Sequence, residues 1–204
     1  MSKSEALEEL KEQIVKDKSL PLYGEANLVF GEGSPDTDVL FIGEAPGFHE
    51  DRLGRPFVGN AGKLLDKLIL ANGWKREEVY ITNIVKRRPP ENRDPLPEEI
   101  EAYKPYLAKQ IEIIDAKAIV PLGRFSMNYF LPEAKISRDQ GKVFWVDGRR
   151  VIPMFHPAAA LRAGAVLKEL ENSFKKLPEL LKEDAPTPVG VFNAGKPSGP
   201  LTLF

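Results

Sequence analysis

The hydrophobic positions of this chain form two patterns that alternate along the sequence. Short uninterrupted apolar runs are typical of strands buried on both faces, and they occur at 39–42, 79–82 and 118–122. Apolar residues at intervals of three and four predict helices over 3–16, 61–72, 97–114, 124–130 and from Pro157 to Leu181. Two further apolar segments, 143–146 and 151–155, flank Asp147-Gly148, which predicts a hairpin. The alternation predicts an α/β fold: a three-layer α/β/α sandwich around a central, mainly parallel four-stranded sheet.

Composition limits the class of protein. The chain has 204 residues, of which 42% are apolar and 29% charged, enough for one globular domain that we expect to span 1–182. Residues 183–204 are rich in proline and glycine and are expected to form a flexible tail. No apolar run approaches the length of a membrane span, and Met1 to Lys16 are too charged for a signal peptide. We therefore expect a cytoplasmic protein without membrane contact.

The residue inventory removes several kinds of chemistry. The chain contains no cysteine, which excludes disulfides, thiolate metal sites and cysteine nucleophiles. His49 and His156 are its two histidines, so a structural zinc site is not expected and no metal is assigned. The net charge of −1 means that binding to nucleic acid would need a local basic patch. The basic, proline-rich segment 86–93 is the candidate for that patch.

The segment after the first predicted strand carries the first candidate chemistry. It reads Gly43-Glu44-Ala45-Pro46-Gly47, followed by Glu50 and Asp51. Ligands of open α/β sheets bind outside the carboxyl ends of the strands, and a carboxylate placed there could activate a water molecule. The alternative is an ordinary strand-to-loop junction with solvated acids, and this segment alone leaves both open.

Three further loops are predicted at the same sheet edge. They carry Phe57, Asn83 with Lys86 to Arg88, and His156 with the residues up to Arg162. An aromatic ring can stack on a base, an amide can pair with the edge of an imide, and a histidine can stabilise a developing oxyanion. Each residue also has a structural alternative: a core or lid position for Phe57, a turn cap for Asn83, a backbone partner for His156, and a solvated loop for the basic run. Their shared position favours a binding site.

The ordered motifs make the chain recognisable. It resembles the family 4 uracil-DNA glycosylases, a bacterial and archaeal group that usually carries an iron–sulfur cluster. The resemblance covers about residues 17–182 and is carried by 43–47 with 50–51, by 54–59, by 82–86 with 88–90 and 92–93, and by 156–158. It implies a base-excision repair enzyme that hydrolyses the bond between uracil and deoxyribose and leaves an abasic site, without a metal or diffusible cofactor.

The resemblance also implies roles for individual residues. Phe57 would stack on a flipped uracil, Asn83 would pair with its polar edge, and Glu50 would crowd C5 and so exclude thymine. Glu44 would activate the attacking water, and His156 would bond to O2 of the leaving uracil. Gly43 and Ala45 complete the uracil-binding set. The DNA would be bound by further residues, Lys86, Arg88, Arg93, Leu161 and Arg162.

The chain departs from the family at the four cluster cysteines. Their positions hold Asp17, Leu20, Arg87 and Tyr103, so the cluster is expected to be absent. We predict that an Asp17–Arg87 ion pair and a Leu20–Tyr103 contact fill the former cluster site.

The last five residues, Pro200 to Phe204, are similar to the peptides with which bacterial repair proteins bind the sliding clamp, although the usual first glutamine is absent. A frayed terminus is the alternative. We otherwise expect a monomer whose partner is uracil-containing DNA. A non-catalytic DNA- or uracil-binding protein that retains the fold is the main alternative function. A nucleoside hydrolase is a third, disfavoured by the basic segment 86–93.

Overall fold

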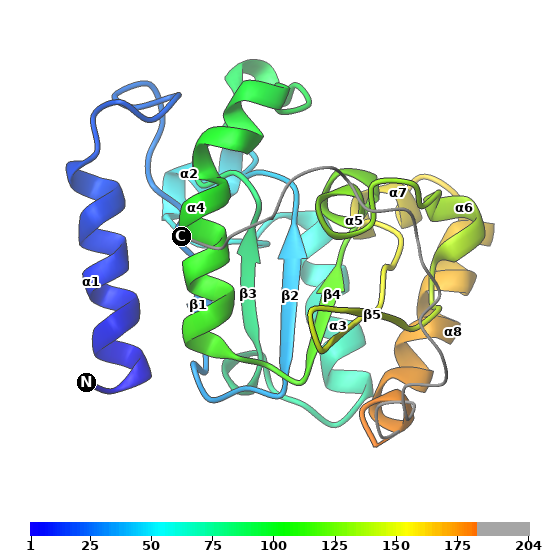
Figure 1. Ribbon diagram of the computed structural model, residues 1–204. Helices are drawn as coiled ribbons and strands as arrows, with labels where there is room; N and C mark the ends of the chain where they lie inside the picture. The colour runs from blue at the N-terminus through cyan, green and yellow to red at the C-terminus, as the bar shows by residue number, and fades with distance from the viewer. Residues whose placement is uncertain (183–204) are drawn as a thin grey trace.

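The computed structural model describes residues 1–182 of the chain. A six-stranded sheet of order β1-β3-β2-β4-β6-β5 lies between two layers of helices (Figure 1). The strands are β1 (Glu32–Gly33), β2 (Val39–Gly43), β3 (Tyr80–Asn83), β4 (Ala118–Pro121), β5 (Phe144–Val146) and β6 (Arg149–Val151). The predicted α/β sandwich is confirmed. The tail 183–204, including the clamp-like Pro200 to Phe204, lies outside the described residues.

The four inner strands, β3, β2, β4 and β6, are parallel, which matches the predicted sheet. Two short antiparallel strands extend it, because β1 pairs with β3 and β5 pairs with β6. With two residues, β1 is too short to leave a pattern in the sequence. The register pairs Gly43 of β2 with Asn83 of β3, so the last residues of these strands are neighbours at one edge.

The helices of residues 1–182 are α1 (Lys3–Lys16), α2 (Phe48–Leu53), α3 (Asn60–Ala71), α4 (Pro97–Ile114), α5 (Arg124–Phe130), α6 (Ile136–Asp139), α7 (Pro157–Ala160) and α8 (Gly164–Leu180), with 3₁₀ turns η1 (Arg76–Glu78) and η2 (Pro90–Asn92). The sequence predicted α1, α3, α4 and α5 within one residue at each end. It did not predict α2 or α6, because six and four residues are too few for a helical period. In the part of the chain that the structure describes, no helix combines the length and apolarity of a membrane span.

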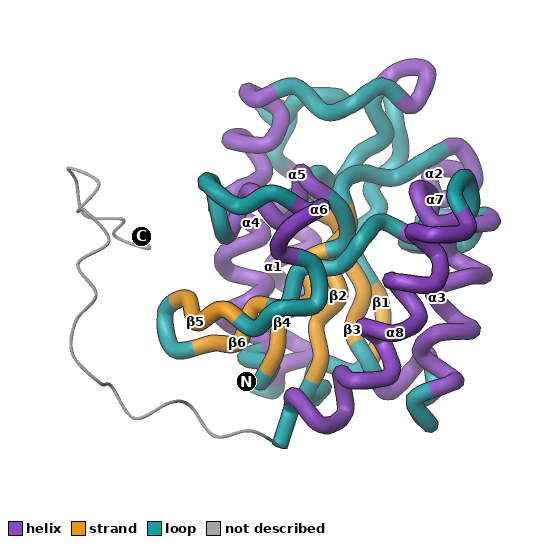
Figure 2. The backbone as a smooth tube through the Cα atoms, turned by 90° about the vertical axis from the view of Figure 1, so that its right-hand side faces the viewer, coloured by secondary structure: helices purple, strands orange, loops and turns teal. Residues whose placement is uncertain are grey.

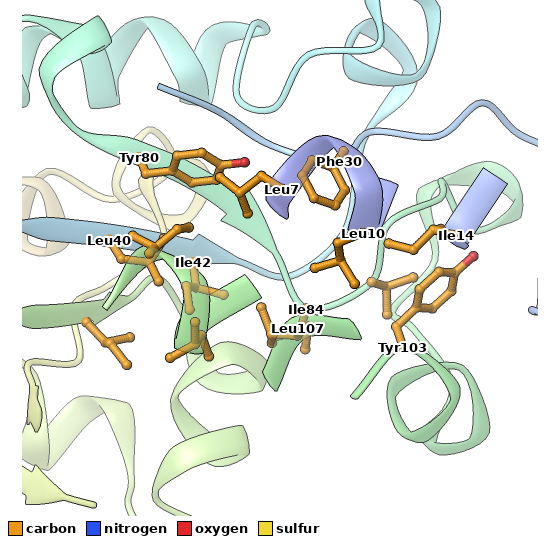
Figure 3. Close-up of a cluster of buried hydrophobic side chains, with 14 of the residues drawn as sticks. Leu7, Leu10, Ile14, Phe30, Leu40, Ile42, Tyr80, Ile84, Tyr103 and Leu107 are labelled. Carbon is orange, nitrogen blue, oxygen red and sulfur yellow. The ribbon is translucent and has the colours of Figure 1, made fainter. Parts of the chain in front are cut away.

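The two helical layers bury opposite faces of the sheet. Leu40 and Ile42 of β2 pack with α1 and α4, whereas Val39 and Phe41 face α3 and α8. Figure 3 shows Leu40 and Ile42 in one cluster with side chains of α1 and α4. Figure 2 shows α4 and α8 on opposite sides of the strands. The Phe41 ring stacks on Phe174 of α8, with centroids 5.7 Å apart. The β2 run is therefore buried on both faces, as its sequence predicts.

The structure corrects two predicted boundaries. The single helix expected from Pro157 to Leu181 is two helices, because Ala163 has an extended backbone (φ −146°, ψ 113°) and ends the helical run. Leu161 and Arg162 therefore lie in an exposed connection. The predicted hairpin is present, but its second strand begins at Arg149, ahead of the expected position. Both turn residues, Asp147 and Gly148, have positive φ values, as this two-residue turn requires.

Candidate functional site

The predicted loops meet in one cavity at the carboxyl ends of β2 and β3, where the strand arrows of Figure 1 point. The cavity has a volume of about 340 Å³. The predicted residues that line it are Glu44, Ala45, Glu50, Phe57, Asn83, Arg93, His156 and Arg162. These positions are far apart in the sequence, and the parallel sheet brings them together because equivalent strand ends share an edge.

Gly43 forms the floor under two of these side chains. A Cβ atom at this position would overlap Asn83 Oδ1 and lie 2.6 Å from two atoms of the Phe57 ring. Any side chain at position 43 would therefore displace the ring and the amide. Glycine is required here for close approach, not for its backbone conformation.

Phe57 is held in place from several directions. Its side chain is buried, and its ring stacks on that of His156 with centroids 5.5 Å apart and 28° between the planes. Its backbone has a φ of 52°, a left-handed conformation that is unfavourable for a bulky residue. Gly62, in the first turn of α3, permits this conformation, because a Cβ there would overlap the Phe57 carbonyl. The first turn of α3 therefore fixes the ring beside the cavity.

Asn83 presents an amide that the protein itself leaves unbonded. The residue ends β3 and is 2% exposed, yet no hydrogen bond within residues 1–182 uses its side chain. Its backbone carbonyl accepts from Lys86 Nζ at 2.8 Å. Its amide is not among the fully enclosed unpaired groups of residues 1–182, so it is open to the cavity and can pair with a ligand that offers both a donor and an acceptor.

His156 caps α7 and is held as a neutral donor. Its Nδ1 accepts from the backbone N–H of Ala158 at 3.1 Å, so the proton of the neutral ring lies on Nε2. Burial lowers the pKa of His156 to about 4. The neutral imidazole therefore persists at pH 7, with an Nε2–H that no hydrogen bond within residues 1–182 uses. Gly123 lets the ring lie against the β4 loop, since a Cβ there would be 3.0 Å from His156 Cβ.

Glu44 is the first residue after β2, and its pKa is shifted upward, whereas that of His156 is shifted downward. Burial, helped by the negative charge of Asp94 and opposed by the positive charge of Arg124, raises the pKa of Glu44 to about 7. Asp94 and Arg124 are themselves an ion pair of 2.7 Å. A carboxylate with this pKa can accept a proton near neutral pH.

Glu50 also holds the cavity wall together. Its Oε1 accepts from the backbone N–H groups of Val58 and Gly59, at 2.9 Å each, and its Oε2 accepts from that of Gly47 at 3.2 Å. The carboxylate thus ties the start of α2 to the start of α3. Its predicted contact with C5 of a base remains a prediction.

Comparison with known proteins identifies the family. Residues 30–181 match the family model of the uracil DNA glycosylase superfamily. The chain belongs to this superfamily. It is 43% identical to a type-4 uracil-DNA glycosylase of Sulfurisphaera tokodaii, over 94% of this chain and 92% of that protein. It is 42% identical to a type-4 uracil-DNA glycosylase of Archaeoglobus fulgidus, over 90% of this chain and 97% of that protein. It is 44% identical to a type-4 uracil-DNA glycosylase of Thermotoga maritima, over 79% of this chain and 86% of that protein.

In this member of the superfamily, one predicted DNA contact is wrong. Lys86 is fully buried, and its Nζ donates to Thr82 Oγ1 at 2.7 Å and Gln110 Oε1 at 2.6 Å in addition to the Asn83 carbonyl. Burial lowers the pKa of Lys86 well below its usual value. A side chain enclosed in this way cannot reach a phosphate. Sequence alone missed this because a lysine in a basic segment is usually solvated.

The other predicted DNA contacts lie at or near the cavity mouth. Arg93 and Arg162 line the cavity, and Leu161 is 51% exposed beside Arg162. Arg93 is also paired with Glu99 at 2.7 Å. Arg88 donates from Nε to Asn92 Oδ1 at 2.6 Å. Their contacts with DNA remain predictions.

The predicted ion pair at the former cluster positions is wrong. Asp17 accepts from the Tyr106 hydroxyl at 2.6 Å and from Ser19, and these bonds lower its pKa. No ion pair within residues 1–182 joins Asp17 to Arg87. Instead, Arg87 Nη1 donates to the Tyr103 hydroxyl at 3.1 Å, and the Arg87 guanidinium lies over the Tyr23 ring.

These residues do not fit an iron–sulfur cluster. Tyr103 is fully buried, Leu20 and Arg87 are each 5% exposed, and the Tyr103 hydroxyl donates to the Pro21 carbonyl at 2.8 Å. Leu20 and Tyr103 belong to one buried cluster, and their direct contact remains a prediction. Cluster iron requires thiolate or equivalent ligands, which these side chains do not supply. In the described part of the chain, no group of three His, Asp or Glu residues could hold a metal ion.

Sequence analysis gave no role to several residues of the site, although all but Ala61 lie in the motifs that carry the resemblance. Pro46, Gly47, Ala61, Pro89, Asn92 and Ala158 also line the cavity. Asn92 has a φ of 55°, a conformation that asparagine tolerates well. An asparagine in a proline-rich segment could therefore have predicted the tight turn that brings this residue to the cavity. The Asp94–Arg124 pair had no such signal, because it joins residues 30 positions apart.

Proposed function

We propose that the protein is a monofunctional uracil-DNA glycosylase that releases uracil from DNA and leaves an abasic site. The observation that carries the proposal is the convergence on one cavity of an aromatic ring, an unpaired amide, a neutral histidine donor and a carboxyl group whose pKa is about 7. The names of the relatives agree with this function. The steps below assign the chemistry to named side chains and water.

Recognition of the base follows from Phe57 and Asn83. Uracil must leave the duplex to reach the cavity, and its ring then stacks on Phe57. The Asn83 amide accepts from N3–H and donates to O4, which satisfies the two groups that the protein leaves unpaired. Cytosine presents an acceptor and a donor in reversed order at the same edge, so it leaves Asn83 mismatched.

Hydrolysis uses Glu44 and His156 in separate roles. The bond between N1 of uracil and C1′ of deoxyribose breaks, its electron pair stays on uracil, and negative charge develops at O2. The Nε2–H of His156 donates to this oxygen, which stabilises the leaving anion. Water attacks C1′ and transfers its proton to Glu44. Arg93, Arg162, Arg88 and Leu161 would bind the DNA around the extruded nucleotide.

A uracil-containing oligonucleotide tests the proposal directly. The protein is incubated with this DNA, the abasic product is cleaved with alkali, and strand breaks are measured on a gel. We expect breaks with the wild type and a rate reduced about 10²-fold or more in Asn83→Ala, Glu44→Gln and His156→Ala. Asn83→Ala should retain the melting temperature, because this amide makes no bond within residues 1–182. Tight binding without breaks would identify a non-catalytic DNA-binding protein instead.

A further inference from the structure

An exposed aromatic side chain lies next to the cavity. Phe48 begins α2 and is 45% exposed. Its ring contacts two guanidinium groups, with Arg52 Cζ 5.6 Å and Arg88 Cζ 5.2 Å from the ring centroid. His49 packs edge-on against the same ring. A single exposed apolar residue is unremarkable, but a ring flanked by two cations is the combination that binds single-stranded nucleic acid.

This group of side chains is continuous with the cavity. Phe48 directly follows Gly47, which lines the cavity. Arg88 donates to Asn92, which lines it from the η2 side. A DNA strand whose uracil occupies the cavity would therefore pass beside the Phe48 ring.

The charges around the ring favour a phosphate backbone. Neither Arg52 nor Arg88 forms an ion pair within residues 1–182. The acids of the same helix are occupied by the protein: Asp51 accepts from the Asn27 backbone N–H at 2.7 Å, and Glu50 accepts from three backbone N–H groups. The two guanidinium groups are thus available to an anionic ligand.

We propose that Phe48, Arg52 and Arg88 form a second DNA site, at which an unpaired base next to the flipped uracil stacks on Phe48 and the arginines bind its phosphates. This proposal rests on the proposed glycosylase function. Base–aromatic stacking is stronger than an exposed cation–π contact, so the base replaces a guanidinium group at the Phe48 ring. The displaced guanidinium group can then bind a phosphate of the DNA. In a duplex the neighbouring base stays paired with the opposite strand and cannot turn toward Phe48, so the site serves single-stranded or opened DNA.

The first test compares Phe48→Ala with the wild type on single-stranded and duplex uracil oligonucleotides. We expect kcat/KM on single strands to fall about tenfold, with less than a twofold change on duplex. The matched control is Leu53→Ala, since Leu53 is a 63% exposed apolar residue of the same helix, and it should change neither value. Phe48→Trp should retain the wild-type preference. An equal loss on both substrates would overturn the proposal.

The second test removes the flanking bases instead of the ring. Abasic analogues on both sides of the uracil should lower the single-strand kcat/KM of the wild type about as much as Phe48→Ala does. The abasic analogues should not lower the single-strand kcat/KM of Phe48→Ala any further, because the stacking contact needs both the Phe48 ring and the flanking base. Fully additive losses would contradict the stacking contact.

A third measurement separates this proposal from the glycosylase function. Fluorescence anisotropy is used to titrate labelled oligothymidine, which contains no uracil, with wild type, Phe48→Ala and Leu53→Ala. We expect weaker binding only for Phe48→Ala. If neither the wild type nor the variants excise uracil, the proposed glycosylase function is wrong, but the affinities for oligothymidine still show whether Phe48 binds DNA. Equal affinities for the three proteins would refute it.

Discussion

At the scale of single residues, one physical cause gives two groups of the site complementary protonation states. Burial raises the pKa of Glu44 to about 7 and lowers that of His156 to about 4, because a low-polarity environment disfavours each charged form. Above pH 7 the site therefore combines a carboxylate base with a neutral imidazole donor. This is the pair that hydrolysis with an anionic leaving group requires.

The pH dependence of excision should report Glu44 alone. As the pH falls below about 7, Glu44 gains a proton and the single-turnover rate should fall tenfold per unit. His156 stays neutral over this range and adds no second step above about pH 4. Glu44→Gln should lower the plateau by about 10²–10⁴-fold and remove the slope. A slope that persists in Glu44→Gln would assign the titration to another group.

At the scale of elements, the end of β3 is attached to α4 by a buried polar network. Lys86 Nζ and Gln110 of α4 both contact Thr82, and Gln110 Nε2 also donates to the Phe30 carbonyl at 3.1 Å. This network fixes the strand end that carries Asn83. The lysine that sequence analysis assigned to DNA thus acts on the strand that carries the cavity-lining Asn83.

Lys86→Met tests this network through the pH dependence of stability. The folded-state pKa of Lys86 lies below its unfolded value, so the unfolded chain binds more protons between the two. The free energy of unfolding should therefore rise with pH between the lowered folded-state pKa and the unfolded value of 10.5, and Lys86→Met should lack this increment. Urea denaturation at several pH values measures the difference. Identical pH profiles would show that Lys86 is charged in the folded protein.

At the scale of the whole molecule, the layer formed by α1 and α4 is braced by side chains at positions where the family usually carries cluster ligands. Tyr103 connects the Pro21 carbonyl to Arg87, and Tyr106 holds Asp17 at the end of α1. These contacts join α4 to the segment after α1, and none of the side chains that make them lines the cavity. This layer is thus stabilised by side chains other than those that line the cavity.

Tyr103→Phe should separate stability from activity. Removing the hydroxyl leaves the partly buried Pro21 carbonyl and the buried Arg87 without their partner, which should lower the free energy of unfolding by about 1–3 kcal/mol. Uracil excision at 25 °C should be unchanged. Iron chelators should not alter the melting temperature of the wild type, because residues 17, 20, 87 and 103 supply no thiolate. A chelator-induced drop would indicate a bound metal.

The sequence by itself determined the longer elements and most of the site. Unbroken apolar runs specify strands buried on both faces, and the register of parallel strands then places Gly43 beside Asn83. The cavity residues Glu44, Phe57 and His156 could be predicted because each follows a strand or lies in a loop at the shared edge. The spacing of apolar residues along the chain indicates which side chains are buried, and this pattern predicts which segments form helices and which form strands.

Only the tertiary structure decided which partner each polar side chain finds. Lys86 bonds to Gln110, 24 positions away, and Asp17 to Tyr106, 89 positions away, so neither choice is visible in a local pattern. The break before α8 likewise depends on backbone angles at Ala163 that no residue type requires. Hydrophobic burial follows periodicity along the chain, whereas hydrogen bonds are directional and depend on geometry that exists only after the layers have packed.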